Sequence, residues 1–176
     1  MKPLRQANWA TWSLISDEKL FRVHPMKTFQ TLQELAACIG QTVAVSPWTE
    51  ITQEQVNMFA EATGDHQWIH IDVEKAKAGP FGAPIAHGFL TLSLIPKLSQ
   101  SAIKIENVRM GVNYGLNKVR FTSPVPVGSK LRGHMKLLNA VPIDGNGMQF
   151  TWEMSIEREG SEKPACIAES LARYYV

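Results

Sequence analysis

The residues best suited to chemistry lie in segment 63–72, which reads Thr-Gly-Asp-His-Gln-Trp-Ile-His-Ile-Asp. Asp65 and His70 could form an acid/base pair. A carboxyl and an imidazole have ordinary pKa values of about 3.9 and 6.5, so modest burial lets them exchange protons near neutral pH. On a continuous helix the two side chains would point about 140° apart, so they can cooperate only if the chain leaves helical geometry after Gly64. Gly64 permits that bend, because glycine adopts left-handed conformations without steric strain.

The same segment leaves other roles open. Asp65 could cap the turn, and His70 could be a hydrogen-bonded packing residue. Asp72 precedes Val-Glu-Lys and is assigned to the N-cap of a short helix. His66 is assigned to the surface or to the surroundings of the site. A metal hydrolase is a further option, because His66 and His70 are four residues apart beside Asp65; however, the chain has no HExxH motif and we expect the segment after Gly64 to be non-helical.

A second candidate element is Ala86-His87-Gly88, which directly precedes a strongly apolar stretch. The first N–H groups of a helix have no intrahelical partner, and the helix dipole favours negative charge beside them. The Gly88 N–H is therefore a candidate donor to an enolate or oxyanion. A helix start at which Gly88 only allows close backbone approach is the alternative. We expect His87 near the N-cap or behind the site, without a catalytic role.

Two helices are expected before these elements. The apolar spacing predicts a helix over 28–39, with a glycine stop at residue 40. A second helix is predicted over 52–63, because Thr52 and Gln55 have the spacing of a capping box. Gly64 is expected to end that helix in a left-handed conformation.

The next elements are expected around the second motif. Segment 42–51 resembles a strand, and Pro47 suggests that it lies at a sheet edge. A short helix is predicted over 73–78. The apolar helix that starts at Gly88 is expected to be buried on most sides, and Pro96 to kink it or end it early.

The second half of the chain has the pattern of antiparallel sheet, and a hairpin turn is predicted at 144–147, Asp-Gly-Asn-Gly. Strands are expected at 106–113, 118–123, 130–139, 148–157 and 164–175. Helices followed by strands predict an α+β fold, in which a curved antiparallel sheet wraps around the apolar helix. An exposed sheet edge or face would favour a dimer.

Composition places the chain among ordinary soluble domains. It has 176 residues, a net charge of +2 and two cysteines, Cys38 and Cys166. We therefore expect no nucleic-acid partner, no membrane span and no disulfide framework, and the cysteines to be buried in a reducing compartment, the cytoplasm. Residues 1–25 are treated as an unassigned extension, and 26–176 as a single domain.

Together, Gly64-Asp65, His70 and Ala86-His87-Gly88 resemble the signature of the MaoC-like dehydratases, the R-specific enoyl-CoA hydratase group within the hotdog fold. The resemblance spans about residue 28 to the C-terminus. Many members have Asn-Pro between the acid and the histidine, whereas this chain has Gln67-Trp68. In this respect it is more similar to the subgroup related to the nodulation NodN proteins.

The resemblance implies a hotdog fold and the reversible addition of water to a trans-2-enoyl-CoA, giving an (R)-3-hydroxyacyl-CoA. It implies that Asp65 and His70 hold the reacting water and that the Gly88 N–H binds the thioester oxygen. Trp68, His87 and Arg120 are assigned to substrate binding. No metal or redox cofactor is implied, because coenzyme A enters as part of the substrate. A homodimer or a dimer of dimers is expected.

Charge is distributed unevenly along the chain. Segment 50–74 has six acids and no Lys or Arg, whereas segment 104–136 has seven bases and one acid. The basic region could receive the phosphates of coenzyme A, although solvated strand faces and charged edges explain such bases at least as well. Two other functions compete with hydration: a hotdog thioesterase, which would release free coenzyme A, and a protein that binds acyl thioesters without turnover.

Overall fold

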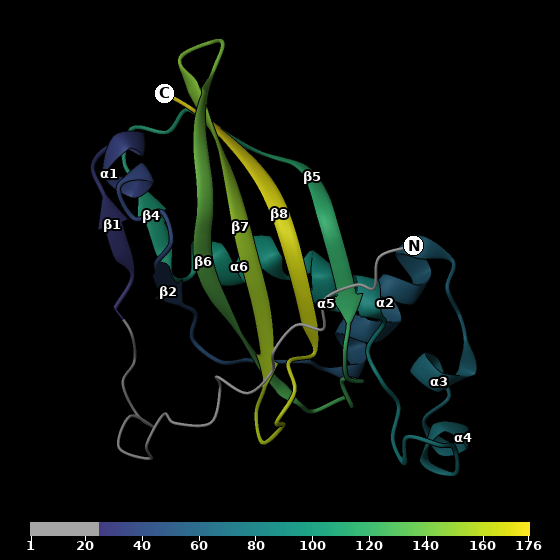
Figure 1. Ribbon diagram of the computed structural model, residues 1–176. Coiled ribbons are helices and arrows are strands. Elements are labelled where there is room, and N and C mark those ends of the chain that lie inside the picture. The colour runs from purple at the N-terminus through teal and green to yellow at the C-terminus, as the bar shows by residue number, and fades with distance from the viewer. Residues whose placement is uncertain (1–24) are drawn as a thin grey trace, which may run out of the picture.

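Figure 1 shows the computed structural model of the protein, which describes the structure of residues 25–176. Except for Pro25, the predicted extension over residues 1–25 lies outside this description. Six strands form one antiparallel sheet with the order β2-β6-β7-β8-β5, and β3 also pairs with β6. These strands are β2 (Thr42–Val45), β3 (Thr49–Glu50), β5 (Met110–Phe121), β6 (Lys130–Ile143), β7 (Gly147–Arg158) and β8 (Cys166–Tyr175).

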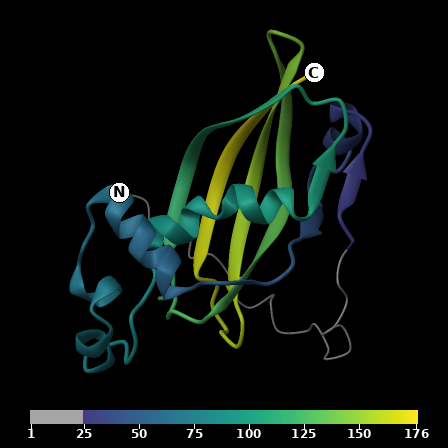
Figure 2. The same ribbon diagram turned by 180° about the vertical axis from the view of Figure 1, so that it is seen from behind.

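The remaining elements flank or cross this sheet. A short parallel pair is formed by β1 (Lys27–Phe29) and β4 (Ile103–Ile105). The helices are α1 (Leu32–Ala36), α2 (Gln53–Thr63), α3 (Trp68–Ile71), α4 (Val73–Lys77), α5 (Gly88–Ser93) and α6 (Ile95–Gln100). Figure 2 shows α5 and α6 crossing one face of the curved sheet, with α2, α3 and α4 beyond one end of this central helix.

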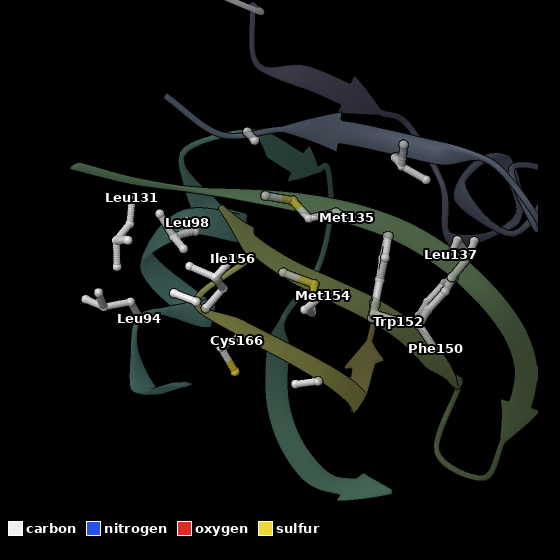
Figure 3. Close-up of a cluster of buried hydrophobic side chains, with 14 of the residues drawn as sticks. Leu94, Leu98, Leu131, Met135, Leu137, Phe150, Trp152, Met154, Ile156 and Cys166 are labelled. Carbon is white, nitrogen blue, oxygen red and sulfur yellow. The ribbon is translucent and has the colours of Figure 1, made fainter. Parts of the chain in front are cut away.

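The main core lies between the central helix and the sheet (Figure 3). Leu94 and Leu98 face inward and join Leu131, Met135 and Ile156 from the sheet, all of which are buried. Burying a side chain of this size stabilises a fold by about 1.5–3 kcal/mol, so this contact fixes the helix on the sheet. The predicted α+β arrangement of an antiparallel sheet around a central helix is confirmed.

The central helix is less enclosed than predicted. The helix breaks at Leu94, two residues before Pro96, which agrees with the kink predicted from the proline. Its apolar residues do not all face protein, because Phe89 is 68% exposed and Leu92 is only partly buried. The prediction of burial on most sides is therefore met in part. Leu90, Leu94 and Leu98 are buried and Leu92 and Ile95 pack partly buried against the core, but the side with Phe89 is open in the single chain.

Two strand and helix boundaries also differ from the predictions. The first helix begins at Leu32 rather than residue 28, because Phe29 belongs to β1 and Thr31 caps the helix by accepting the Glu34 N–H. The segments 106–113 and 118–123 do not form separate strands. Most of the residues of these two segments, together with the residues between them, form the single strand β5. This strand stays paired with β8 across two register shifts.

Turn predictions agree with the structure. The capping box of Thr52 and Gln55 is present, and Gly64 ends α2 with a φ of 77°. The β6–β7 hairpin turns through Gly145 and Asn146, which both have positive φ values. Pro47 lies between β2 and β3, both of which pair with one side of β6, so its predicted edge position is confirmed.

The opposite edge of the sheet is long and exposed. β5 pairs with β8, and no further strand among residues 25–176 covers its other side. Large apolar side chains are exposed along it, including Met110, Val112, Tyr114 and Leu116. Such an edge is a ready template for pairing with another chain. None of the helices described by the structure has the length and apolar character needed to cross a bilayer.

The two cysteines have different surroundings. Cys166 is buried in the core, and that burial raises the pKa of its thiol to about 11. Cys38 is only half-buried, so the prediction that both are buried holds for Cys166 alone. Both thiols are free.

Candidate active site

The bend that separates Asp65 from α2 is present. Gly64 adopts the left-handed conformation, and the chain then runs without helical structure through Asp65, His66 and Gln67. The Asp65 side chain is 56% exposed, so its carboxylate reaches solvent at this turn. The bend predicted from the positions of Gly64 and Asp65 is therefore confirmed.

His70 lies on α3, a single helical turn that the sequence did not indicate. The prediction that the whole segment after Gly64 is non-helical is therefore wrong beyond Gln67. The short helix is anchored at both sides: the Gln53 side-chain amide donates to the His70 carbonyl at 2.8 Å, and the Ile85 N–H donates to the Ile69 carbonyl at 3.0 Å. These bonds hold His70 beside the chain that leads into α5.

The orientation of the His70 ring is fixed by a main-chain carbonyl. Its Nδ1 lies 2.6 Å from the Ile85 oxygen, and the ring is 7% exposed. A carbonyl oxygen can only accept a hydrogen bond, so Nδ1 carries the hydrogen and Nε2 keeps a free lone pair. This contact leaves Nε2 of His70 able to accept a proton. Because the anchor is a main-chain carbonyl, no feature of the Ile85 side chain could reveal it in the sequence.

Burial sets the protonation preference of His70. Desolvation disfavours the imidazolium and lowers the pKa of His70 below its ordinary value of 6.5, and the nearby His87 lowers it further. The hydrogen bond to Ile85 and the charge of Asp65 act in the opposite direction but do not reverse the shift. At neutral pH the ring is therefore predominantly in the neutral form required of a base.

Asp65, His70 and His87 gather into one cluster. One nitrogen or oxygen atom from each lies within 4.8 Å of those from the other two. A single water can bridge an acid and a base at this separation, because two hydrogen bonds of about 2.7–2.8 Å span it. The pair predicted from the sequence is thus close in space. His87, which we expect near the N-cap or behind the site without a catalytic role, lies in the same cluster.

The N-terminus of α5 lies directly after this cluster. Gly88 is its first residue, so the Gly88 N–H has no helical partner. A Cβ built on Gly88 would lie only 2.8 Å from Cδ2 of Phe121, so the ring excludes any larger residue. The chain before Gly88 is held by bonds from the Ala86 N–H to the Val125 carbonyl and from the Val127 N–H to the Pro84 carbonyl. These contacts fix the amide in place.

The other candidate residues lie around this centre. The Trp68 ring packs against Gly79 and under the Lys75 ammonium, 4.9 Å from its centroid. Asp72 caps α4, accepting the Lys75 N–H at 3.0 Å, as predicted. His66 is on the surface, 3.7 Å from Glu61.

Arg120 is exposed on β5 and donates to the adjacent Val119 carbonyl. Its substrate-binding role, like that of Trp68, stays a prediction. Two of the seven bases in 104–136 are neutralised in ion pairs, Lys104 with Glu106 and Arg132 with Glu157. The basic region is therefore weaker than the sequence suggested.

The same three side chains form the one group among residues 25–176 whose atoms could hold a metal ion. His70 and His87 lie stacked, with ring centroids 3.8 Å apart and planes inclined by 28°. Imidazole lone pairs lie in the ring plane, so stacked rings do not direct them at a common point as a tetrahedral metal requires. This geometry suits proton transfer better than metal coordination.

A cavity of about 580 Å³ runs along the central helix. Its walls include Leu92, Ile95 and Ser99 from the helix and Leu116, Ala172 and Tyr174 from β5 and β8. The small residues Gly111, Gly115 and Ser170 also line it and leave it open. Volumes of several hundred Å³ with mostly apolar walls are typical of small-molecule sites.

The family model of the MaoC like domain matches residues 34–153, which is more than half of the chain. The chain belongs to the MaoC-like dehydratase family. It is similar to the 3-hydroxyacyl-thioester dehydratase Z of Mycobacterium tuberculosis, with 52% identity over 149 residues, covering 85% of this chain and 99% of that protein. This MaoC-like dehydratase is therefore a hydro-lyase, an enzyme that adds or removes water.

Two further comparisons agree with this membership. Nodulation protein N of Rhizobium leguminosarum is 41% identical over 140 residues, covering 78% of this chain and 87% of that protein. The unliganded R-hydratase of Pseudomonas aeruginosa has a similar structure, with a TM-score of 0.61 and 23% identity, covering 78% of this chain and 81% of that one. The predicted family, its NodN-like relatives and the hotdog fold are confirmed.

Proposed function

We propose that this MaoC-like dehydratase interconverts trans-2-enoyl-CoA and (R)-3-hydroxyacyl-CoA thioesters. The observation that carries the proposal is the cluster of Asp65 and His70 within 4.8 Å, together with the Gly88 N–H, which begins α5 and has no partner within the helix. An acid, a base and an oxyanion donor are the three groups that hydration of a conjugated thioester needs. The dehydratase of Mycobacterium tuberculosis named above supports the same substrate class.

In the hydration direction, the thioester oxygen accepts the Gly88 N–H and the substrate is polarised toward attack at C3. A water held between Asp65 and His70 gives its proton to Nε2 of His70 as its oxygen bonds to C3. The electrons of the C2–C3 double bond move onto the thioester as an enolate. The acid/base pair then returns a proton to C2 on the same face, so no net proton is gained or lost.

The cavity along the central helix supports an acyl tail longer than the four carbons of crotonate. It begins one turn beyond Gly88, at Leu92, and extends to Tyr174 at the far end of β8. Its walls are mainly apolar, and the polar side chains among them are those of Ser93, Ser99, Gln100, Asn113 and Ser170. A hydrocarbon tail that enters it is removed from water, at about 25 cal/mol per Å² of buried area.

The carrier of the acyl group is proposed to be coenzyme A. Lys118 and Arg120 are exposed on β5, two and four residues from the end of the cavity wall at Leu116, and Phe121 contacts the Gly88 site. A cation at this position can pair with the phosphates of coenzyme A. An acyl carrier protein also ends in a phosphopantetheine thioester and is the alternative carrier that the test must separate.

The working form is proposed to be a homodimer that pairs through β5. The strand has twelve residues, an unpaired side and exposed apolar side chains. An edge of this length is normally covered in a soluble protein. A second copy of the chain would cover it and the exposed Phe89 beside Gly88.

The test is incubation with crotonyl-CoA and with octenoyl and dodecenoyl thioesters of coenzyme A, following loss of the conjugated enone absorbance. The expected product is the (R)-3-hydroxyacyl thioester, identified by coupling to an R-specific dehydrogenase. Release of free thiol without hydration would identify a thioesterase. Binding without turnover over a prolonged incubation would identify a binding protein. Asp65→Asn is the control that should lose the reaction.

A further inference from the structure

His87 occupies an unusual position for a residue that precedes a helix. It is 2% exposed, yet its side chain makes no cap hydrogen bond to α5. Instead the ring points back toward the turn after α2. Its Nε2 lies 2.9 Å from the Asp65 carbonyl oxygen, twenty-two residues earlier in the chain.

The tautomer of His87 follows from this contact. The Asp65 carbonyl can only accept, so Nε2 carries the hydrogen, and in the neutral ring Nδ1 has none. Nδ1 is buried and has no hydrogen-bond partner in the part of the chain described here. An unpaired buried polar atom lowers the stability of a fold, and a packing role alone would be met better by an apolar ring.

The ring of His87 also contacts the base. It stacks on His70 with a centroid separation of 3.8 Å, and Phe59 lies on it at 5.0 Å with a 48° tilt. His87 thus touches the Asp65 main chain through its edge and the His70 ring through its face. The carboxylate of Asp65 is no closer than 4.0 Å to Nε2, so the main-chain contact is the one that orders the turn.

Asp65 depends on this contact. Its own N–H reaches only the Thr63 hydroxyl, at the long distance of 3.5 Å, and its side chain is 56% exposed. The His66 N–H of the same peptide donates to the Gly64 carbonyl at 3.2 Å, but that bond lies within the turn itself. The shorter hydrogen bond from His87 is the one that joins the turn to the residue before α5. Small displacements of a reacting group lower rates strongly, so the turn must be held for catalysis.

We propose that His87 is the positioning residue of this site, and that its Nε2–H sets where the Asp65 carboxylate stands relative to His70 and the Gly88 N–H. This inference rests on the hydratase function proposed above, since Asp65 is the group that it positions. His87 itself transfers no proton. His87 directly precedes Gly88 in the chain. It therefore connects the acid/base pair with the proposed oxyanion donor.

Three substitutions separate the hydrogen bond from the ring stack. His87→Gln keeps an amide N–H at a reach similar to Nε2 but removes the ring. His87→Phe keeps a ring on His70 but removes the donor. His87→Asn keeps a polar side chain that is too short to reach Asp65. The matched control is His134→Phe, the same change at a histidine that pairs with Glu157 across β6 and β7.

In crotonyl-CoA hydration we expect His87→Gln to keep at least a third of the wild-type kcat. We expect kcat to fall about 10- to 100-fold in His87→Phe and His87→Asn, with KM within twofold of wild type, because the turn is misplaced while the binding surface is kept. His134→Phe should keep the wild-type kcat. Equal kcat in the Phe and Gln variants would overturn the inference. If the Phe variant does not fold, the kcat values of the Gln and Asn variants test the inference, and equal values would overturn it.

A second measurement does not depend on turnover. Long-range proton–nitrogen NMR spectra of histidine-labelled protein should show His87 with its hydrogen on Nε2 and His70 with its hydrogen on Nδ1. A His87 hydrogen on Nδ1 would exclude donation to Asp65 and overturn the inference. Absence of hydration by the wild-type enzyme with the expected tautomers would instead reject the proposed function.

Discussion

The Phe121 ring lies against the α-carbon of Gly88, so that a Cβ on Gly88 would be 2.8 Å from Cδ2 and 3.0 Å from Cε2 of the ring. Phe121 is the last residue of β5 and Gly88 the first residue of α5. Phe89 also packs on this ring, with centroids 5.7 Å apart. The edge of the sheet thereby holds the start of the central helix, where the proposed oxyanion donor, the Gly88 N–H, lies.

Gly88→Ala is expected to lower kcat by about 100-fold, because the new methyl group forces the ring or the helix start to move, and loss of an oxyanion donor has an effect of this size. Adding Phe121→Ala should restore much of the rate, since it removes the atoms that the methyl group meets. Hydration kinetics of the two single variants and the double variant measure the coupling. Additive losses in the double variant would contradict this account.

Asp65→Asn is expected to keep the fold and lose most turnover, about 10²- to 10⁴-fold, because the amide is nearly isosteric but can neither accept nor deliver the proton. The side chain is 56% exposed, so the melting temperature should change little. The control is Glu61→Gln, an exposed acid on the same helix end. A variant with a rate near that of the wild type would remove Asp65 from the mechanism.

The pH dependence of hydration should report His70. Its pKa is lowered below 6.5, chiefly by burial, so the ring is neutral and active above that pKa and protonated below it. We expect kcat/KM to fall as the pH decreases, with a midpoint below 6.5. The charge of Asp65 raises the pKa of His70, so the residual activity of Asp65→Asn should have its midpoint at a still lower pH. A wild-type midpoint above 6.5 would disagree with the structure.

Tyr114→Glu is expected to convert the proposed dimer to a monomer, because it places a charge on the exposed edge strand. Tyr114 is 53% exposed, and the Arg173 guanidinium lies 3.2 Å from its ring centroid. A glutamate there would meet a cation, so the single chain should still fold. Light scattering after size exclusion measures the mass, with Val141→Glu on β6 as the matched control. An unchanged dimer would exclude pairing through β5.

Arg120→Ser tests recognition of the coenzyme A phosphates. We expect KM for crotonyl-CoA to rise severalfold, and to rise less at high salt, because exposed ion pairs are screened. KM for crotonyl-pantetheine, which has no nucleotide, should be the same in variant and wild type. Equal effects on both substrates would place Arg120 outside nucleotide recognition. If the wild-type enzyme strongly prefers thioesters of an acyl carrier protein to those of coenzyme A, then coenzyme A is not the carrier.

Local patterns predicted the parts of this protein that depend on few neighbours. The capping box of Thr52 and Gln55, the left-handed Gly64 and the Asp72 cap depend on residues within one turn, and all are present. The strict alternation of apolar and polar residues predicted β7. A strand with one buried and one solvated face has this pattern whichever strand it pairs with. The acid/base pair was predicted because a glycine separates it from the helix and because the spacing resembles a known family.

Other features depend on contacts between distant segments. The fusion of two expected strands into β5 follows from pairing with β8, whose register shifts absorb the interruption near Gly115. The helical turn that contains His70 is held by bonds to Gln53 and Ile85, and neither bond has a signature along the chain.

The sequence by itself determined which groups could do chemistry here, because residue type fixes acidity, donor capacity and backbone freedom. Only the tertiary structure decided how they meet. It brought His87 against both Asp65 and His70, left one side of the central helix open, and placed Phe121 on Gly88. Those relations are set by the packing of helix on sheet, which sums many weak contacts among residues far apart in the chain, and no local pattern encodes that sum.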